Sequence, residues 1–111
     1  MDKREAVRVP VRLRAQCRAD DVVIDGMVED ISRSGVFFRA PKAMEAKAIE
    51  AGVSTEIHLN LPGETMLQLT AKVVRVDEAG MGLVFVGGHE HSRKPLANFI
   101  MRCHATHWNW S

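Results

Sequence analysis

The fold is decided first by a stretch near the N-terminus, VRVPVRLRAQC (residues 7–17), in which apolar and polar side chains alternate. A period of two is typical of a β-strand with one buried face and one solvent face. Pro10 stands near the start of this stretch, where a missing N–H is tolerated. The pattern predicts a half-buried strand whose inner face carries Val9, Val11, Leu13 and Ala15.

Five further stretches have the composition of strands, and turn residues such as Ser34-Gly35 and Pro62-Gly63 separate them. They lie at 22–31, 36–39, 56–61, 66–76 and 81–86. Gly26, inside the first of these, indicates a bulge or bend. Six short strands at regular spacing predict a mainly all-β protein, a small six-stranded antiparallel barrel.

Two segments outside the strands favour helix. Residues 94–106 place an apolar stripe at i, i+3, i+4 and i+7, and Pro95 suits the first turn. The stripe consists of Leu96, Phe99, Ile100 and Cys103. The segment 40–54 is expected to be a loop with a short helix within 43–50, ahead of Gly52. We expect the C-terminal helix to pack on the barrel and cover an open edge or end.

Length and composition narrow the class of protein. The 111 residues suit one domain, and no apolar run approaches the roughly 18–20 residues that span a bilayer. The N-terminus has no signal peptide, so we expect a cytoplasmic protein with reduced thiols. The 15 basic and 14 acidic residues give a net charge of +1, which argues against a DNA or RNA coat.

The positive charge is concentrated at the N-terminus. Residues 1–18 hold six basic and two acidic side chains, and six minus two leaves +4 there, against +1 for the whole chain. This distribution favours a compact anionic ligand over a long polyanion. A solvated face of arginines is the alternative that charge alone leaves open.

Two short motifs carry the chemistry. Arg4 and Arg8 stand four residues apart, and arginine presents a planar fork of donors that suits phosphates and guanine edges. In the second motif, Asp30 and Ser32 would share one side if the chain is extended, and Gly35 permits a positive φ or a close backbone approach. Each motif also has a simpler interpretation, a solvated basic tail and an Asx or Ser turn.

In combination the motifs resemble those of the PilZ domain family, bacterial receptors for cyclic di-GMP. The family pattern is RxxxR near the N-terminus followed by (D/N)xSxxG, and this sequence matches both in full. GMGLVF at 80–85 is similar to the last barrel strand of the family. The resemblance covers residues 3–106 and implies a six-stranded PilZ-like barrel with a C-terminal α-helix.

The resemblance also implies a domain layout and a ligand site. The chain would be one PilZ domain over 1–111, with a ligand-gripping arm at 1–8, the barrel at 9–87 and the helix at 93–106. Arg4 and Arg8 would contact guanine edges and phosphates, and Asp30 would accept from guanine N–H groups. Ser32 would donate to a phosphate or base, and Gly35 would admit the ligand to the backbone. Lys3 and Arg33 are additional candidates, and one or two ligands per chain remain open.

Binding would fold the mobile arm Met1–Val7 onto the barrel and relay the signal to an unidentified partner protein. No nucleophile–base pair is apparent, so no catalysis, cofactor or metal is expected. The main alternative is a PilZ-fold adaptor that does not depend on nucleotide. For that role Trp108 and Trp110 would anchor a partner or a second subunit, or would fold back on the barrel.

Other kinds of site and function fit the sequence less well. A metal site would draw on the C-terminal histidines and a cysteine, but the sequence has no CxxC. Its ligands would come from His89, His91, Cys103, His104 and His107. Cys17 has only Cys103 as an intramolecular partner, and we expect it to be a small buried residue rather than half of a disulfide. A nucleic-acid-binding barrel of the OB type would need more stacking platforms than six aromatic side chains.

Overall fold

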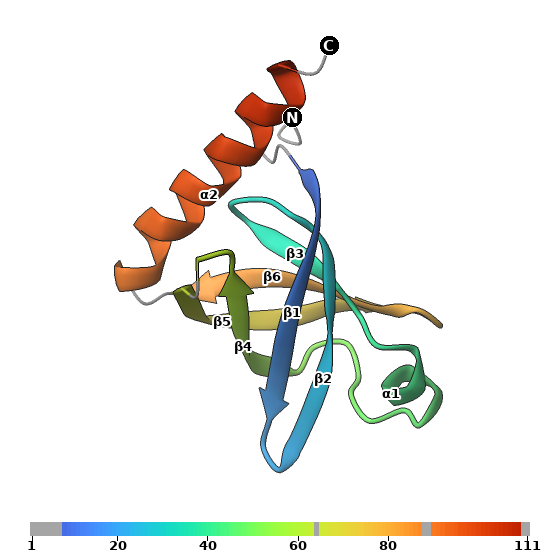
Figure 1. Cartoon of the computed structure of the whole chain (residues 1–111). Coiled ribbons are helices and arrows are strands. Elements are labelled where there is room, and N and C mark those ends of the chain that lie inside the picture. The colour runs from blue at the N-terminus through green and yellow to red at the C-terminus, as the bar shows by residue number, and fades with distance from the viewer. Residues whose placement is uncertain (1–7, 64, 88–89, 110–111) are drawn as a thin grey trace, which may run out of the picture.

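The six predicted strands form a closed antiparallel barrel in the order β1-β2-β3-β6-β5-β4 (Figure 1). The structure is a computed structural model that describes residues 8–63, 65–87 and 90–109, and side chains in the last range only for 91–103. The strands are β1 (Val9–Ala19), β2 (Val22–Ile31), β3 (Gly35–Arg39), β4 (Ser54–Leu61), β5 (Thr65–Val76) and β6 (Gly80–Gly87). Helix α1 (Pro41–Glu45) lies between β3 and β4, and α2 (Glu90–Asn109) follows β6.

The barrel interior is filled by the apolar side chains of alternate strand positions, as the sequence pattern predicts. Its fully buried members include Cys17, Val28, Phe38, Ile57, Leu59, Ala71, Val73 and Met81. In β1 the alternation is interrupted by a register shift between Pro10 and Leu13. Val11 is therefore only partly buried, whereas Val9, Leu13 and Ala15 lie in the core as expected.

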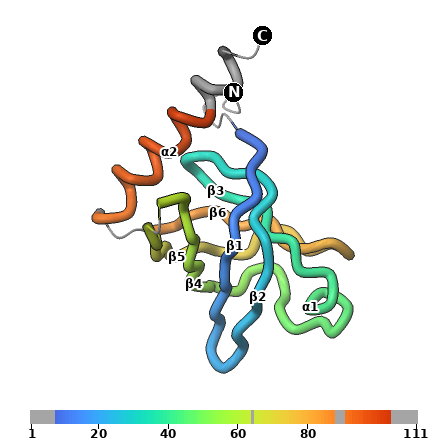
Figure 2. The backbone as a smooth tube through the Cα atoms, in the orientation of Figure 1, coloured from blue at the N-terminus to red at the C-terminus, as the bar shows by residue number. Residues whose placement is uncertain are grey.

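The β1–β2 hairpin is long and projects past the rest of the barrel (Figure 2). Its register runs from Val9 opposite Ile31 to Ala19 opposite Val22, so the start of β1 lies beside the end of β2. The bulge predicted at Gly26 is wrong, because Gly26 pairs regularly with Ala15. A Cβ at Gly26 would instead lie 2.5 Å from the carbonyl oxygen of Arg39 on β3.

Helix α2 packs its first half on the barrel through Leu96, Phe99 and Ile100, which are buried as predicted. It begins at Glu90, earlier than expected, so Pro95 lies inside the helix rather than in its first turn. The extra turn is held by Ser92, whose hydroxyl donates to the Gln68 carbonyl of β5 at 3.2 Å. Among the helices that the structure describes, none is long and apolar enough to cross a membrane.

The short helix predicted within 43–50 exists, but it is α1 and begins at Pro41. Proline at the first position of a helix sacrifices no hydrogen bond, because that N–H has no partner within the helix. Lys47 adopts a positive φ of 55°, so the chain leaves the helical conformation well before Gly52. Helix α1 lies at the opposite end of the barrel from α2 (Figure 1).

Candidate functional site

Arg8 and Asp30, one residue from each sequence motif, are brought together by the pairing of β1 with β2. In the antiparallel register Val9 lies opposite Ile31 and Pro10 opposite Asp30, so the residue before β1 reaches the end of β2. The Nη2 atom of Arg8 is 3.2 Å from Oδ1 of Asp30. The two side chains are 45% and 36% exposed. The pair is therefore open to a ligand arriving from solvent.

A β-bulge positions Asp30 on this surface. Val28 pairs with Phe38 and Asp30 with Phe37, which leaves Glu29 as an extra residue in β2. Bulges of this kind bend a strand and re-aim its side chains. The Oδ1 atom of Asp30 is buried and makes no aligned hydrogen bond with a described residue, so its contact with Arg8 is an ion pair alone. The carboxylate retains unused hydrogen-bond acceptor capacity.

The Ser32 hydroxyl builds the turn between β2 and β3. Ser32 is fully buried, and its Oγ accepts from the backbone N–H groups of Ser34 and Gly35 at 3.1 and 3.2 Å. The N–H of Ser32 donates to the Gly35 carbonyl at 2.9 Å. Asp30 and Ser32 would share one side only in an extended chain, but β2 ends at residue 31 and Ser32 turns inward. The alternative interpretation of the motif, a Ser turn between two strands, is therefore confirmed for Ser32.

Gly35 is required by the neighbouring strand. It pairs with Val84 on β6, and a Cβ on Gly35 would clash with the carbonyl oxygen of Leu83. The positive φ that the sequence left open is not used here, since the described glycines with positive φ are Gly52 and Gly63. The close backbone approach is confirmed, and the group that approaches is β6.

Phe37, a neighbour of Asp30, and Arg75, which contacts Phe37, were missed by the sequence analysis. Phe37 is the cross-strand partner of Asp30, so their side chains lie on the same face of the sheet. The Arg75 guanidinium lies over the Phe37 ring, 5.8 Å from its centroid. Phe37 follows Asp30 by seven residues, and this spacing gave no signal, because the turn and the bulge at Glu29 decide which face of the sheet Phe37 shares.

The remaining candidates divide between exposed positions and residues outside the described ranges. Arg33 is exposed in the turn and makes no ion pair with a described residue. Lys3, Arg4 and the arm Met1–Val7 lie outside the described residues, as do the side chain of Trp108 and the whole of Trp110. The structure thus brings Arg8 next to Asp30 and does not test the rest of the predicted arm.

Both cysteines are free thiols, and Cys17 is a small buried residue, as expected. Cys17 is fully buried, and this burial raises the pKa of its thiol to about 12, with a smaller opposing effect of a hydrogen bond with Thr55. Within the described residues no three His, Cys, Asp or Glu side chains gather to hold a metal. His89 and the side chains of His104 and His107 lie outside that part of the chain.

The family follows from a sequence comparison made against models of known domains. The model of the PilZ domain matches residues 2–102, which is most of the chain. The chain belongs to the PilZ domain family. This membership agrees with the closed barrel and its C-terminal helix. No curated protein matches the sequence.

Solved PilZ structures share the fold at low sequence identity. The Bacillus subtilis inhibitor of motility, MotI/DgrA, gives a TM-score of 0.81 at 19% identity, covering 96% of this chain and 53% of its own. This chain thus spans about half the length of MotI/DgrA. The PilZ domain of Escherichia coli YcgR with c-di-GMP gives 0.76 at 14% identity, over 95% and 94% of the two chains. The PilZ domain of CeSA from a cellulose-synthesizing bacterium gives 0.66 at 15%, over 86% and 95%.

Proposed function

We propose that this chain is a receptor for cyclic di-GMP that relays the signal to a partner protein. Membership of the PilZ family supports this proposal, as does the shared fold with the YcgR domain, whose structure contains c-di-GMP. The observation that carries the proposal is the Arg8–Asp30 pair, 3.2 Å apart on the barrel surface. It combines a fork of donors with a carboxylate acceptor at the junction of the two motifs.

The chemistry of the pair matches the chemistry of the messenger. Cyclic di-GMP carries two phosphodiester charges and two guanines. The Asp30 carboxylate would accept from the N–H groups on the guanine edge in charge-assisted hydrogen bonds. Arg8 would exchange its contact with Asp30 for a phosphate or for the O6 and N7 atoms of guanine. The exchange is accessible because partly exposed ion pairs contribute only about 0.2–1 kcal/mol.

Ser32 and Gly35 act in this proposal by shaping the turn. Oγ of Ser32 is already engaged by Ser34 and Gly35, and Ser32 has no exposed surface. A direct contact with the ligand would require the turn to open, so we assign Ser32 the role of a positioning residue. Arg33, which is exposed in the same turn, would add a phosphate contact.

Phe37 extends the proposed site beyond the two motifs. A guanine held by Asp30 would lie near the cross-strand neighbour of Asp30, and an aromatic ring or a guanidinium plane is a suitable stacking surface. Phe37 and Arg75 offer both in one contact. Arg4 and Lys3 would close over the ligand from the N-terminal side, and ordering of the arm would change the surface presented to the partner.

Calorimetric titration of the purified chain with cyclic di-GMP tests the proposal. We expect saturable binding and a rise in melting temperature with ligand, because a ligand that binds only the folded state stabilises it. Asp30→Asn keeps the shape of the side chain and removes its charge, so the affinity should fall at least tenfold. Glu29→Gln is the matched control, since Glu29 is the adjacent carboxylate and pairs with Arg39 instead.

Absence of heat and of any melting shift at high micromolar ligand would overturn the receptor proposal. The nucleotide-independent adaptor would then take its place. Equal losses in Asp30→Asn and Glu29→Gln would place the guanine contact elsewhere. Titration with GMP shows whether both halves of the cyclic dinucleotide are needed.

A further inference from the structure

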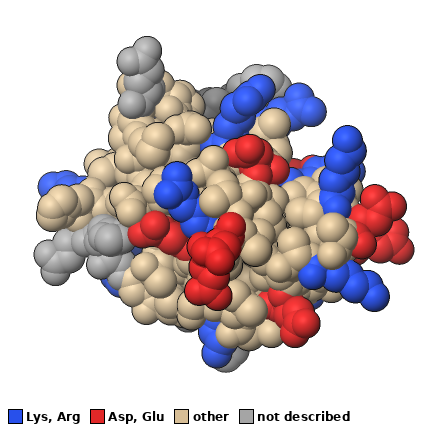
Figure 3. Space-filling model, turned by 90° about the horizontal axis from the view of Figure 1, so that it is seen from below, with Lys and Arg blue, Asp and Glu red and all other residues tan. Residues whose placement is uncertain are grey.

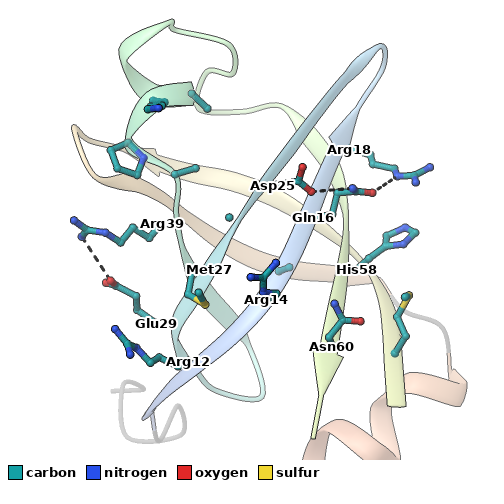
Figure 4. Close-up of a pocket in the computed structure, with 17 residues that line it drawn as sticks. Arg12, Arg14, Gln16, Arg18, Asp25, Met27, Glu29, Arg39, His58 and Asn60 are labelled. Carbon is teal, nitrogen blue, oxygen red and sulfur yellow. Dashed lines mark hydrogen bonds and ion pairs between the residues drawn. The ribbon is translucent and has the colours of Figure 1, made fainter. Parts of the chain in front are cut away.

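An open groove of about 990 Å³ runs along the outer face of the barrel, and neither Arg8 nor Asp30 lines it. Its lining comes mainly from β1, β2 and β4, with Arg39 of β3, Met66 of β5 and the start of α1. Figure 4 shows Arg12, Arg14 and Arg18 of β1 arranged along it. Neither Arg14 nor Arg18 belongs to the proposed messenger site, so the groove requires a separate functional interpretation.

The arginines of the groove form a ladder. Outward-facing residues of a strand recur every second position, and each residue rises about 3.3 Å. Arg12, Arg14 and Arg18 are all exposed and fall on this period, with Gln16 filling the step between the last two. Arg12 and Arg14 have no ion pair with a described residue, and Arg18 donates to Gln16 at 3.0 Å. The ladder therefore presents two arginines, Arg12 and Arg14, that no described carboxylate neutralises, at positions set by the two-residue period of the strand.

The acidic residues of the groove are already engaged. Glu29 pairs with Arg39 at 3.5 Å, and Asp25 accepts from the Gln16 side chain at 3.0 Å. They do not neutralise Arg12 or Arg14, but they interrupt the positive field. A continuous polyanion such as a nucleic-acid strand would meet these two carboxylates. Figure 3 likewise shows acidic and basic side chains interspersed on the face that it presents, rather than one broad basic surface.

The apolar side chains of the groove point to a peptide. Met27 lies opposite Arg14 in the β1–β2 register, and Met66 on β5 is 60% exposed. Methionine adapts its shape to apolar side chains of a partner. No described lining residue is Phe or Trp, so the groove lacks the stacking platforms on which single-stranded nucleic acids depend.

We propose that this groove docks an extended acidic segment of a partner protein. The segment would carry carboxylates at alternate positions, which matches the two-residue period of the arginine ladder, and an apolar side chain that rests on Met27 or on Met66. From residue 15 to residue 18, β1 is paired on both sides, with β2 and with β4, so the segment is recognised by side chains and not by adding a strand. This proposal does not depend on the messenger.

The test uses the full chain and a fluorescein-labelled peptide of about ten residues, the length that an extended chain needs to cover this ladder. In the peptide Glu alternates with Thr, and Leu replaces Glu at one of the groove-facing positions. Fluorescence anisotropy should give saturable binding that weakens as salt is raised to physiological strength. A peptide of the same composition with its glutamates grouped together should bind more weakly, because it cannot match the period of the ladder.

Variants locate the binding. Arg14→Gln and Arg18→Gln should each lower the affinity for the peptide up to about fivefold, as expected for exposed ion pairs. The double variant should lower it about tenfold or more. Arg93→Gln is the matched control, because Arg93 is exposed on α2 outside the groove. Asp30→Asn should leave peptide binding unchanged, which separates this proposal from the receptor proposal.

Four results would overturn the inference. They are absence of peptide binding at low salt, equal affinity for the grouped peptide, equal or tighter binding of an oligothymidine strand, and loss of cyclic di-GMP binding in Arg14→Gln and Arg18→Gln. The third result would assign the groove to nucleic acid. The fourth would make it part of the messenger site.

Discussion

Arg8 stands immediately before β1, and its guanidinium lies 3.2 Å from the carboxylate of Asp30 near the end of β2. The two residues are 22 positions apart in the sequence (30 minus 8) and are joined by the register of one hairpin. Their opposite charges form a partly exposed ion pair. This contact holds both groups on the surface where we expect the messenger to bind.

We predict that Arg8→Gln separates stability from ligand binding. The ion pair is partly exposed, so its loss should change the free energy of unfolding by no more than about 1 kcal/mol. The affinity for cyclic di-GMP should fall about tenfold or more, because a charge-assisted contact with the ligand is lost. Urea unfolding and calorimetry measure the two quantities. Unchanged affinity, with Arg93→Gln as reference, would remove Arg8 from the site.

Ser32→Ala should lower stability. The buried Oγ accepts from the N–H groups of Ser34 and Gly35, and its removal leaves those donors unsatisfied, at a cost of about 1–3 kcal/mol in the free energy of unfolding. Ser54→Ala is the control, because Ser54 is exposed at the start of β4. If both variants unfold at the same urea concentration, the turn does not depend on the hydroxyl.

Gly35→Ala should destabilise the barrel by about 3 kcal/mol, since the new methyl group would meet the Leu83 carbonyl and push β3 away from β6. Gly87→Ala provides the comparison. A Cβ at Gly87 meets nothing within 4 Å, so that variant should stay within about 0.5 kcal/mol of the parent. Thermal unfolding under identical conditions compares the melting temperatures of the two variants. Similar melting temperatures would contradict the close approach of β6 to Gly35.

The buried thiol of Cys17 predicts a loss of stability at high pH. Burial raises its pKa to about 12 from 9.0, so the folded chain keeps the proton that the unfolded chain releases. This contribution is complete below pH 9 and declines as the pH rises through about 12, by up to about 1.4 kcal/mol per pH unit. Cys17→Ala should show a flatter stability profile over that range.

Thiol reactivity provides an independent check on Cys17. At pH 8 iodoacetamide should modify Cys103, which is only partly buried, much faster than Cys17. Mass spectrometry of the two tryptic peptides distinguishes the sites. Equal rates of modification would mean that Cys17 is accessible in the native state.

Much of the fold could be predicted because its signals are local. The alternation in β1 and the stripe of Leu96, Phe99 and Ile100 in α2 each follow from the period of one element, and both faces are buried as predicted apart from Val11, which is partly buried. The helix boundary was wrong by several residues, since Ser92 extends α2 through a hydrogen bond to Gln68, a residue distant in sequence. Gly26 was misread as a bulge for a similar reason, since its neighbours come from β3.

The sequence by itself determined the elements, the two motifs and the family that they resemble, because periodicity and motif spacing are properties of the chain alone. Only the tertiary structure decided which motif residues meet. The hairpin register joins Arg8 to Asp30, the turn buries Ser32, and the bulge at Glu29 sets Phe37 beside Asp30. Strand pairing and burial are set by contacts between distant segments, and local sequence carries no direct record of them.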